Sequence, residues 1–298
     1  MASSFNGLVI NDNGYLTLPV GSVLQRPTAT PGMMRFNNAT TANNIEYYDA
    51  RWNNQDKLVL SLDANDSASY PGTGSIWYDI SGNNNHVQLF NSPAYTSGTP
   101  AYFTFNGTNN YCRTIKPVDM SYEGYFSVEV SWYNGGAGSV CLWEHTGDWN
   151  QFPGGFGMFT NSNGGGNFPG LVHMNSTSGQ GARNFPIPSS SNIWLITHQQ
   201  TASVSDSNGY RAWLDGASAA FDSSQQQNPA TFQNQSRKGI GRLDHFYLGC
   251  RGNPGNTNPA VPSYFFNGRI ATFKVWQSKR TDAQVLASFN SLKARYGL

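Results

Sequence analysis

The sequence predicts an all-β protein: an antiparallel two-sheet sandwich over residues 57–298 that ends in one short helix, preceded by a small irregular segment of residues 1–56. Three observations lead to this prediction. Short stretches of alternating apolar and polar residues recur from residue 57 onward, and such alternation is the signature of half-buried strands. Charged residues make up only 12% of the chain while glycine occurs 32 times, which suits short strands joined by turns. A well-formed helix start lies close to the C-terminus.

The predicted strands follow one another along the chain. Residues 102–105 form one of them and end at the turn pair Asn106-Gly107. In residues 126–132, large apolar residues alternate with Ser127, Glu129 and Ser131, which predicts one buried face and one face in contact with water. Further strands are expected at residues 58–62, 139–143, 193–198, 246–249 and 269–276, and at 210–214 before the turn signal Asp215-Gly216.

The C-terminal helix is predicted from residue 281 onward. Thr281 and Gln284 stand three residues apart, as in a capping box, where each side chain bonds to the other residue's backbone N–H. Val285, Phe289 and Leu292 then fall on one face of a helix, so they predict an apolar stripe that packs against the rest of the protein.

The first 56 residues differ in character from the rest. Pro19, Pro27 and Pro31 interrupt them, and proline cannot donate to a strand ladder, so only short strands are expected, at residues 33–36 and 45–48. A segment of this size cannot bury a core of its own. We expect it to pack on its own copies or on another surface, as an anchor or trimerisation segment.

Charge and composition exclude several partner classes. The formal net charge is +1, so nothing favours nucleic acid. No apolar run of about 18 residues is present, so no membrane insertion is expected. The N-terminus lacks the basic and apolar regions of a secretory signal, which predicts synthesis in a reducing cytosol. The three cysteines, an odd number without close spacing, are expected to be buried thiols; they are Cys112, Cys141 and Cys250.

Both ends of the predicted sandwich resemble a known kind of domain. They are similar to the laminin-G-like, concanavalin A-like lectin/glucanase modules of phage structural proteins. The resemblance implies a jelly-roll arrangement of the two sheets. It rests on Leu62-Asp63-Ala64, Ser69-Tyr70-Pro71-Gly72-Thr73-Gly74 and Trp77-Tyr78-Asp79-Ile80-Ser81-Gly82-Asn83-Asn84-Asn85 at one end, and on Asn267-Gly268-Arg269-Ile270, Val275-Trp276 and the helix at the other.

The N-terminal segment resembles a motif of phage tail and head fibres. This resemblance implies a virion protein, a homo-oligomer (a trimer) and other virion proteins as partners, with tail, baseplate and capsid all open as the attachment site. The motif occurs once, which excludes a long repetitive shaft. The matching residues are Leu18-Pro19-Val20-Gly21, Gln25-Arg26-Pro27, Pro31-Gly32-Met33, Arg35-Phe36-Asn37, Glu46-Tyr47-Tyr48-Asp49 and Trp52.

One polar loop carries the residue types of a sugar site. Sugars present hydroxyl edges and flat C–H faces, so they need an aromatic platform beside planar polar side chains. Residues 144–151 offer both, and neighbouring loops add more. The alternative is that Trp149 packs as a loop anchor and the polar groups face water; Trp132, Trp194 and Trp213 are expected in the core. The candidate sugar-binding residues are His145, Asp148, Trp149, Asn150, Asn175 and Arg183.

A metal site is a second possibility. Calcium takes oxygen ligands from carboxylates and amides, and Asp63, Asp79 and Asn83 could supply them. The alternative is turn chemistry, in which Asp and Asn side chains bond to nearby backbone N–H groups. The sequence therefore predicts no certain cofactor and leaves calcium open.

Catalysis is not expected. Glycoside hydrolysis needs two carboxyl groups flanking the scissile bond. The chain has only four glutamates, and Glu129 lies on a strand with no second carboxylate beside it, which favours a solvent-facing residue. We therefore expect a virion fibre or spike that displays a lectin-like sandwich to host-surface glycans. The alternatives are a capsid or tail decoration protein with a purely structural role and, third, a polysaccharide depolymerase.

Overall fold

The computed structural model describes most of the C-terminal domain and short parts of the N-terminal segment. The described residues are 9–10, 16–18, 20–21, 34–37, 44–48, 52–54, 58–120, 126–135, 140–145, 156–160, 170–175, 179–184, 192–201, 210–219, 243–252 and 262–298.

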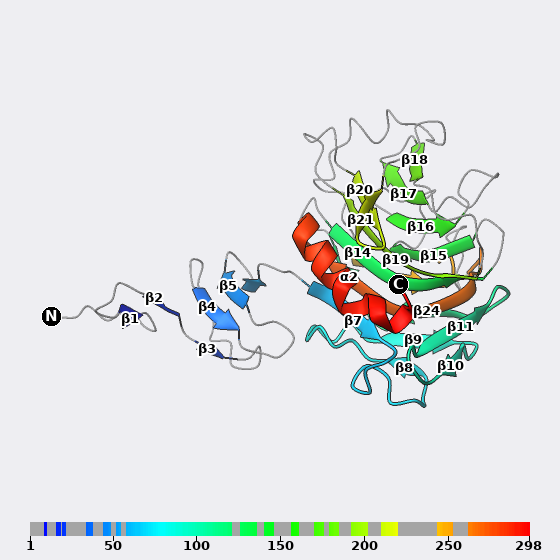
Figure 1. The fold of residues 1–298 in the computed structure, drawn as a ribbon, viewed down its shortest axis with the longest axis horizontal. Coiled ribbons are helices and arrows are strands. Elements are labelled where there is room, and N and C mark those ends of the chain that lie inside the picture. The colour runs from blue at the N-terminus through cyan, green and yellow to red at the C-terminus, as the bar shows by residue number, and fades with distance from the viewer. Residues whose placement is uncertain are drawn as a thin grey trace.

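The predicted antiparallel sandwich is confirmed. Two eight-stranded sheets lie face to face, with every pairing inside them antiparallel (Figure 1). We call the first one sheet I. Its strand order is β10-β11-β24-β14-β19-β20-β21, and β7 also pairs with β24. The bounds are β7 (Leu58–Asp63), β10 (Ala94–Thr96), β11 (Tyr102–Asn106), β14 (Phe126–Asn134), β19 (Trp194–Thr201), β20 (Tyr210–Leu214), β21 (Ala217–Ala219) and β24 (Asn267–Trp276).

The second layer, sheet II, has the order β18-β17-β16-β15-β23-β12-β9-β8. Its strands are β8 (Ile76–Trp77), β9 (Val87–Phe90), β12 (Tyr111–Thr114), β15 (Val140–His145), β16 (Phe156–Thr160), β17 (Gly170–Asn175), β18 (Gly179–Asn184) and β23 (Phe246–Leu248). A separate two-stranded ladder joins β13 (Val118–Asp119) to β22 (Leu243–Asp244).

Strand β24 brings the two ends of the sandwich together. It pairs with β14 along one edge. On its other edge the first half pairs with β11 and the second half with β7, where Phe273 faces Leu62 and Val275 faces Leu60. Consequently residues 58–63 lie beside residues 272–276, more than 200 positions further along the chain.

The core lies between the two sheets and is rich in aromatic rings. Each buried aromatic side chain removes about 150–250 Å² from water, so these rings dominate the stability of the domain. All three cysteines are free and buried, as expected. The largest fully buried side chains are Trp77, Trp132, Trp143, Trp213, Phe103, Phe105, Phe126, Phe246, Phe266 and Phe273.

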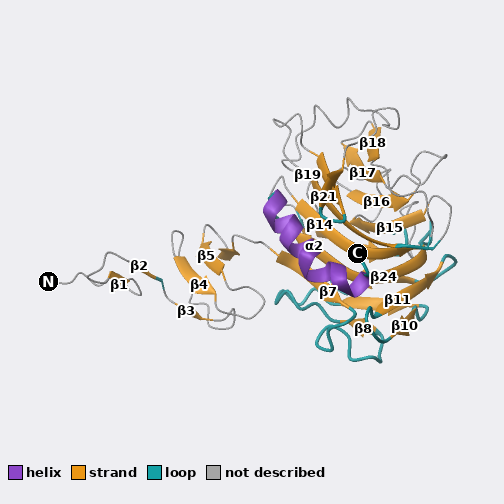
Figure 2. Cartoon of the chain, viewed as in Figure 1, coloured by secondary structure: helices purple, strands orange, loops and turns teal. Residues whose placement is uncertain are grey.

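The predicted helix is confirmed as α2 (Asp282–Tyr296), with its capping box. The Gln284 backbone N–H donates to Thr281 Oγ1 at 3.2 Å, and the Thr281 N–H donates to Gln284 Oε1 at 2.9 Å. The helix crosses the outer face of sheet I (Figure 2). Its buried residues Leu292 and Tyr296 pack with Ile196 and Ala271, and the partly buried Trp194 lies against them.

This packing corrects one prediction about β14. The face that was expected to meet water carries Ser127, Glu129 and Ser131, and each of these is at most 1% exposed. Ser288 of α2 donates a hydrogen bond to Glu129, so at this position the helix itself covers the face. Both faces of sheet I are therefore buried here, between the core on one side and α2 on the other.

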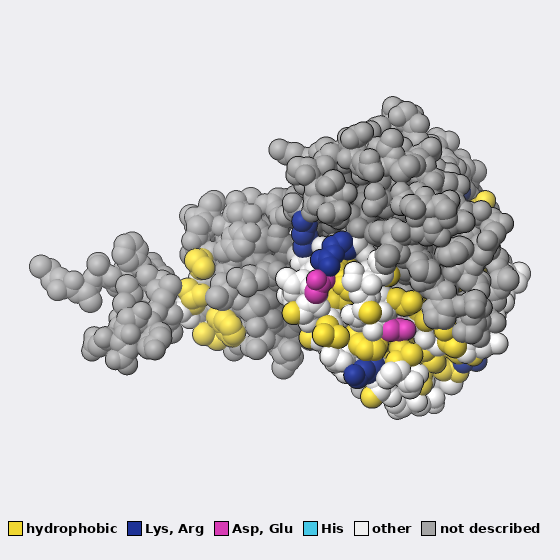
Figure 3. Space-filling model, turned by 45° about the horizontal axis from the view of Figure 1, so that its top comes forward, with side chains coloured by type: hydrophobic (Ala, Val, Ile, Leu, Met, Phe, Trp, Pro, Cys, Tyr) yellow, Lys and Arg dark blue, Asp and Glu magenta, His cyan; other side chains and the backbone are white. Residues whose placement is uncertain are grey.

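The N-terminal strands pair among themselves. Strands β4 and β5 fall where short strands were expected. In the described part of this segment, the exposed fractions of Val20 and Met34 are 61% and 48%, and Figure 3 shows hydrophobic atoms on its surface. The strands form a pair β1-β2 and a sheet β3-β4-β5-β6; they are β1 (Val9–Ile10), β2 (Leu16–Thr17), β3 (Val20–Gly21), β4 (Met34–Asn37), β5 (Asn44–Tyr48) and β6 (Trp52–Asn54).

Candidate binding site beside the C-terminal helix

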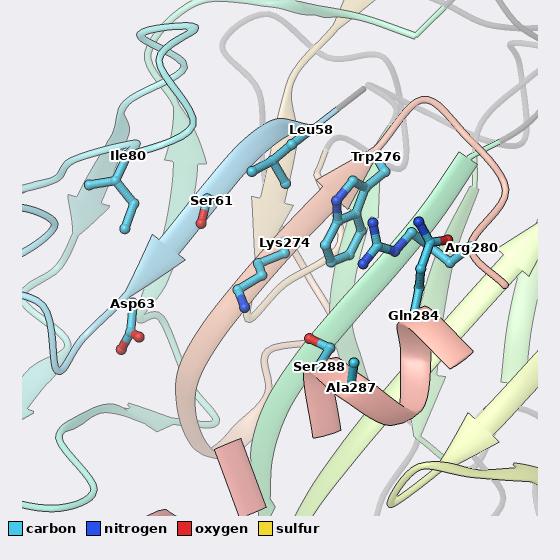
Figure 4. A pocket seen from close by; sticks show the side chains of 10 residues that line it. All are labelled: Leu58, Ser61, Asp63, Ile80, Lys274, Trp276, Arg280, Gln284, Ala287 and Ser288. Atoms are coloured by element: carbon cyan, nitrogen blue, oxygen red, sulfur yellow. The ribbon is translucent and has the colours of Figure 1, made fainter. Parts of the chain in front are cut away.

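A pocket of about 420 Å³ opens on the outer side of sheet I, between β7 and β24, which lie side by side, and the first turns of α2 (Figure 4). We call it the α2 pocket. Its volume lies within the range of about 300–1,000 Å³ that is usual for small-molecule sites. It is lined by Leu58, Ser61, Asp63, Ile80, Lys274, Trp276, Arg280, Gln284, Ala287 and Ser288.

Glu129 lies beside the pocket, buried under α2. Its Oε1 accepts a hydrogen bond from Ser288 Oγ at 2.9 Å and lies 3.5 Å from Lys274 Nζ. Its Oε2 lies 3.9 Å from His198 Nδ1. Burial alone raises the pKa of this carboxyl, but the Lys274 ammonium, His198 and Ser288 outweigh burial and hold the pKa at about 2. Glu129 is therefore ionised at neutral pH.

Lys274 supplies a positive charge to the pocket. Its side chain is 21% exposed and extends toward the space between Asp63 and Ser288 (Figure 4). Among the residues that the structure describes, Glu129 is its only charged partner. Because an ammonium group has three donors, this single carboxylate leaves donors available for a ligand.

Asp63 lines the opposite side, and its carboxylate is already engaged. Arg295 Nη1 lies 2.9 Å from Oδ1 and 2.7 Å from Oδ2, and the Asn65 N–H donates to Oδ1 at 2.9 Å. This bridge ties the last turns of α2 to the end of β7. It leaves Asp63 little capacity to accept hydrogen bonds from a ligand.

Arg280 closes the end of the pocket near the start of α2. Its guanidinium lies 4.6 Å from the ring centroid of Trp276, a cation–π distance. Burial lowers the pKa of Arg280 to about 10, so the group remains cationic at neutral pH. The Arg280 backbone N–H donates to Gln200 Oε1 at 2.8 Å, which fixes the turn between β24 and α2.

The pocket is completed by small polar and apolar groups. The Ser61 hydroxyl has no hydrogen-bond partner within the described ranges and points into the space between β7 and α2 (Figure 4). Gln284 Oε1 is held by the capping box, so its exposed amide nitrogen is the group left for a ligand. Leu58, Ile80 and Ala287 contribute apolar surface.

The three residues considered for a metal have other partners. The Asp79 carboxylate accepts the backbone N–H groups of Ser61, Ser81 and Asn85, each at 2.9 Å. Asn83 Nδ2 donates to the Leu58 carbonyl at 2.8 Å, and Asp63 pairs with Arg295. Within the described residues no group of three His, Cys, Asp or Glu side chains is placed to hold a metal ion. These bonds instead fix the loop after Asp79 against β7.

Most of the predicted sugar-binding residues cannot be placed within the described part of the chain. Asp148, Trp149 and Asn150 lie outside the described residues. Asn175 is the last residue of β17, and Arg183 lies on the neighbouring strand β18, where it pairs with Leu171 of β17. The side chains of Asn175 and Arg183 lie outside the described part of the structure.

His145 does not lie where a side chain could contact a bound sugar. It belongs to β15 and is fully buried. Its Nε2 lies 3.0 Å from the Val118 carbonyl oxygen, and its ring centroid is 4.4 Å from that of Phe246. Because a sugar reaches a protein from solvent, we remove His145 from the candidate set.

The prediction of a solvent-facing Glu129 was wrong, as its 1% exposure shows. Glu144 is also fully buried, and it accepts the Gly252 N–H at 3.3 Å. These are the two glutamates whose side chains lie in the described part of the chain, and both are buried. The pocket residues Lys274, Arg280 and Ser288 were not anticipated from the sequence.

Comparisons with known proteins identify the fold. No family model matches the chain, and no curated protein matches it in sequence. Solved structures do match. A receptor-binding domain aligns with 80% of this chain at a TM-score of 0.55 and 15% identity, and the match covers 51% of that domain's chain.

Two further matches hold sugars according to their descriptions. The binding domain of botulinum neurotoxin DC, solved in complex with SialylT, aligns with 80% of this chain and 52% of its own at a TM-score of 0.54 and 14% identity. Domain 4 of AbnA, a GH43 extracellular arabinanase from Geobacillus stearothermophilus solved with arabinotriose, aligns with 78% of this chain and 98% of its own, at a TM-score of 0.51 and 15% identity. This chain thus spans about half the length of the toxin domain and nearly all of the arabinanase domain. It has the fold of lectin-like β-sandwich binding domains.

Proposed function

We propose that this protein is a virion structural protein, a fibre or spike of a phage, whose sandwich binds cell-surface glycans. The observation that carries the proposal is the two-layer antiparallel sandwich, which is shared with binding domains whose solved structures hold SialylT and arabinotriose. Fold alone does not set function, so the proposal also rests on the chemistry of the surface and on the N-terminal segment.

Binding is favoured over hydrolysis by the state of Glu129 and Glu144, the two glutamates with described side chains. A hydrolase needs two carboxyl groups that face the substrate across an open cleft. Glu129 is held under α2 by Ser288 and Lys274, and Glu144 is fully buried in sheet II. The α2 pocket instead presents lysine, arginine, hydroxyl and amide groups, which bind without bond cleavage.

The virion part of the proposal rests on residues 1–56, which resemble a phage fibre motif. Val20 and Met34 expose large apolar side chains on the small N-terminal strands, and such side chains favour packing against another copy or another virion protein. We propose that this segment joins three copies of the chain and attaches them to the particle.

A glycan array tests the binding function. The full chain is expected to bind at least one class of cell-surface glycan. Trp149→Ala is expected to weaken that binding, and Trp149→Phe, which keeps an aromatic ring, is expected to retain it. A thermal melt of each variant separates loss of binding from loss of fold. An array without any retained glycan, together with normal particle assembly, would favour the purely structural decoration role.

Light scattering tests the oligomer. The expected mass is three times that of one chain. The variants Val20→Asp and Met34→Asp place a charge in the proposed contact and are expected to shift the mass toward one chain. Leu243→Asp is the control, because Leu243 is 65% exposed on the sandwich and lies outside the N-terminal segment. An unchanged mass in both N-terminal variants would refute this contact.

A further inference from the structure

We propose that the outer face of sheet I binds a pyranose ring of a glycan beside the C-terminal end of α2. The inference rests on the proposed function, since it places one contact with the glycan on the described part of the sandwich. The site is a group of four partly exposed side chains that we call the aromatic strip. It consists of Tyr102, Tyr133, Trp194 and Arg269.

Strand pairing places the aromatic strip on one surface. In the register, Arg269 of β24 faces Tyr133 of β14, and Tyr133 faces Trp194 of β19. Residues that face one another across neighbouring strands point to the same side of a sheet. Tyr102 lies on β11, the strand on the other side of β24. The Trp194 ring centroid is 4.8 Å from that of Tyr296 in α2, so Trp194, which was expected in the core, lies on the outer face.

The four side chains of the aromatic strip converge on one another. The Arg269 guanidinium lies 4.8 Å from the ring centroid of Tyr102 and 4.4 Å from that of Tyr133, which are cation–π distances. The Trp194 ring centroid lies 5.6 Å from that of Tyr102 and 5.5 Å from that of Tyr133. The aromatic strip is therefore one continuous surface in which a cation lies against two tyrosine rings. The contact with Tyr296 fixes its third ring in place.

The polar groups of the aromatic strip are available to a ligand. They have no hydrogen-bond partner among the residues that the structure describes, and none of their nitrogen or oxygen atoms is fully buried. Arg269 also has no carboxylate partner in this part of the chain; its contacts are the two tyrosine rings. The guanidinium and the indole N–H can only donate, whereas the tyrosine hydroxyls both donate and accept. A ligand that satisfies these groups must therefore bring several oxygen acceptors.

A pyranose ring meets these requirements. It presents C–H groups on a flat face and hydroxyls around its edge, and tyrosine and tryptophan combine an apolar ring with a polar tip in the same way. The fork of N–H donors on Arg269 can bond to two neighbouring hydroxyl oxygens. An apolar chain would leave the polar groups without partners, and a small anion would leave the aromatic rings without contact. We therefore assign the aromatic strip to one sugar ring of a larger glycan.

The experiment is saturation-transfer NMR and titration of the full chain with four probes, the methyl pyranosides of D-glucose, D-galactose, D-mannose and N-acetyl-D-glucosamine. D-Sorbitol is the comparison ligand, because it carries hydroxyls without a ring face. At least one pyranoside is expected to receive saturation at its ring C–H protons and to bind more tightly than sorbitol.

The variants remove polar groups and keep the aromatic rings. Arg269→Gln removes the charge and the fork, and it is expected to weaken binding of the pyranoside at least about tenfold, because hydrogen bonds from charged groups are the stronger ones. Tyr102→Phe/Tyr133→Phe removes two hydroxyls and is expected to weaken binding less. Arg211→Gln is the matched control and should bind like the parent protein. Arg211 also lies over a tryptophan ring, at 4.5 Å, but it pairs with Asp282 at the other end of α2. A thermal melt of each variant separates loss of binding from loss of fold.

Several results would overturn the inference. These are the absence of saturation transfer to all four pyranosides, an equal affinity for sorbitol, or an unchanged affinity in both Arg269→Gln and the double tyrosine variant. If the array retains a glycan and both variants bind that glycan like the parent protein, this inference fails and the proposed function stands. If neither the array glycans nor the pyranosides bind, both fail.

Discussion

Glu129 allows the clearest quantitative prediction. This carboxylate is 1% exposed, and its pKa in the folded protein is held at about 2, against an ordinary value of 4.5. One pKa unit corresponds to about 1.4 kcal/mol of differential stabilisation of the charged form. The difference between the two values therefore corresponds to about 3 kcal/mol of folding free energy from this single group.

The sign follows from the direction of the shift. Because the folded pKa is depressed, the contribution is fully present above the unfolded value of 4.5 and is lost as the pH falls toward 2. The perturbation is Glu129→Gln, which keeps the size of the side chain and an acceptor for Ser288. Between pH 6 and pH 2, the free energy of unfolding should fall less in the variant than in the parent protein. The difference between the two losses is expected to be about 3 kcal/mol.

Urea denaturation at a series of pH values measures this difference. Subtracting the two curves removes the contributions of the other acidic groups, which titrate in both proteins. Asp66→Asn, which removes an exposed carboxylate of the same domain, is the control for the loss of one negative charge. If Glu129→Gln has the same pH dependence as the parent protein, the assignment of Glu129 as a buried, paired carboxylate is refuted.

Three further predictions concern the scaffold. Gly216→Ala should lower the free energy of unfolding by more than about 1 kcal/mol, because φ is +77° and a Cβ would lie 2.7 Å from Phe289 Cδ1. Gly82→Ala is the control and should cost less, because φ is +90° there but no atom lies within 4 Å of the added Cβ. Equal losses of stability in thermal melts would contradict the role of Phe289. Thr281→Ala removes the helix cap and should lower the free energy of unfolding by about 1 kcal/mol, as measured by urea denaturation. An unchanged free energy of unfolding would show that the cap does not stabilise α2. Burial raises the pKa of the Cys112, Cys141 and Cys250 thiols, so a thiol reagent should modify them only after unfolding, and rapid labelling of the native protein would contradict their burial.

The sequence predicted those features that depend on local pattern. The inward face of β14, with Val128, Val130 and Trp132, follows from strict alternation. The cap of α2 follows from Thr281 and Gln284. In both cases the pattern lies within one element, so no knowledge of its neighbours is needed.

The outward face of β14 could not be predicted in the same way. Ser127 and Glu129 are polar, and polar residues on alternate positions normally indicate contact with water. Glu129 is buried because α2, some 150 residues later, lies on it. The Ser127 hydroxyl is buried against the carbonyl oxygen of Ser278, in the turn that precedes the helix. The apolar stripe of α2 predicted that the helix packs, but it carried no information about which surface it covers.

His145 shows a different limit of sequence patterns. The strand was expected to end at residue 143, but β15 continues to His145. The register shifts between Cys141 and Trp143, so Leu142 and Trp143 are both buried and strict alternation is lost. A bulge of this kind has no clear sequence signal in this segment, and the side chains beyond it cannot be assigned to a face from periodicity.

The α2 pocket was invisible in the sequence because its residues are far apart. Ser61 and Asp63 on β7 meet Lys274 on β24 only through the pairing of strands separated by more than 200 positions. The motif resemblance covered both of these ends without showing that they are neighbours. Only the three-dimensional structure unites them beside α2.

Binding to whole cells tests the central claim most directly. The labelled full chain is added to candidate host cells that are untreated, oxidised with mild periodate or treated with a protease. Periodate destroys the sugar diols on the cell surface, and the protease removes surface proteins. We predict that binding is lost after periodate treatment and survives proteolysis. Binding that survives periodate treatment and is lost on proteolysis would contradict a glycan-binding function.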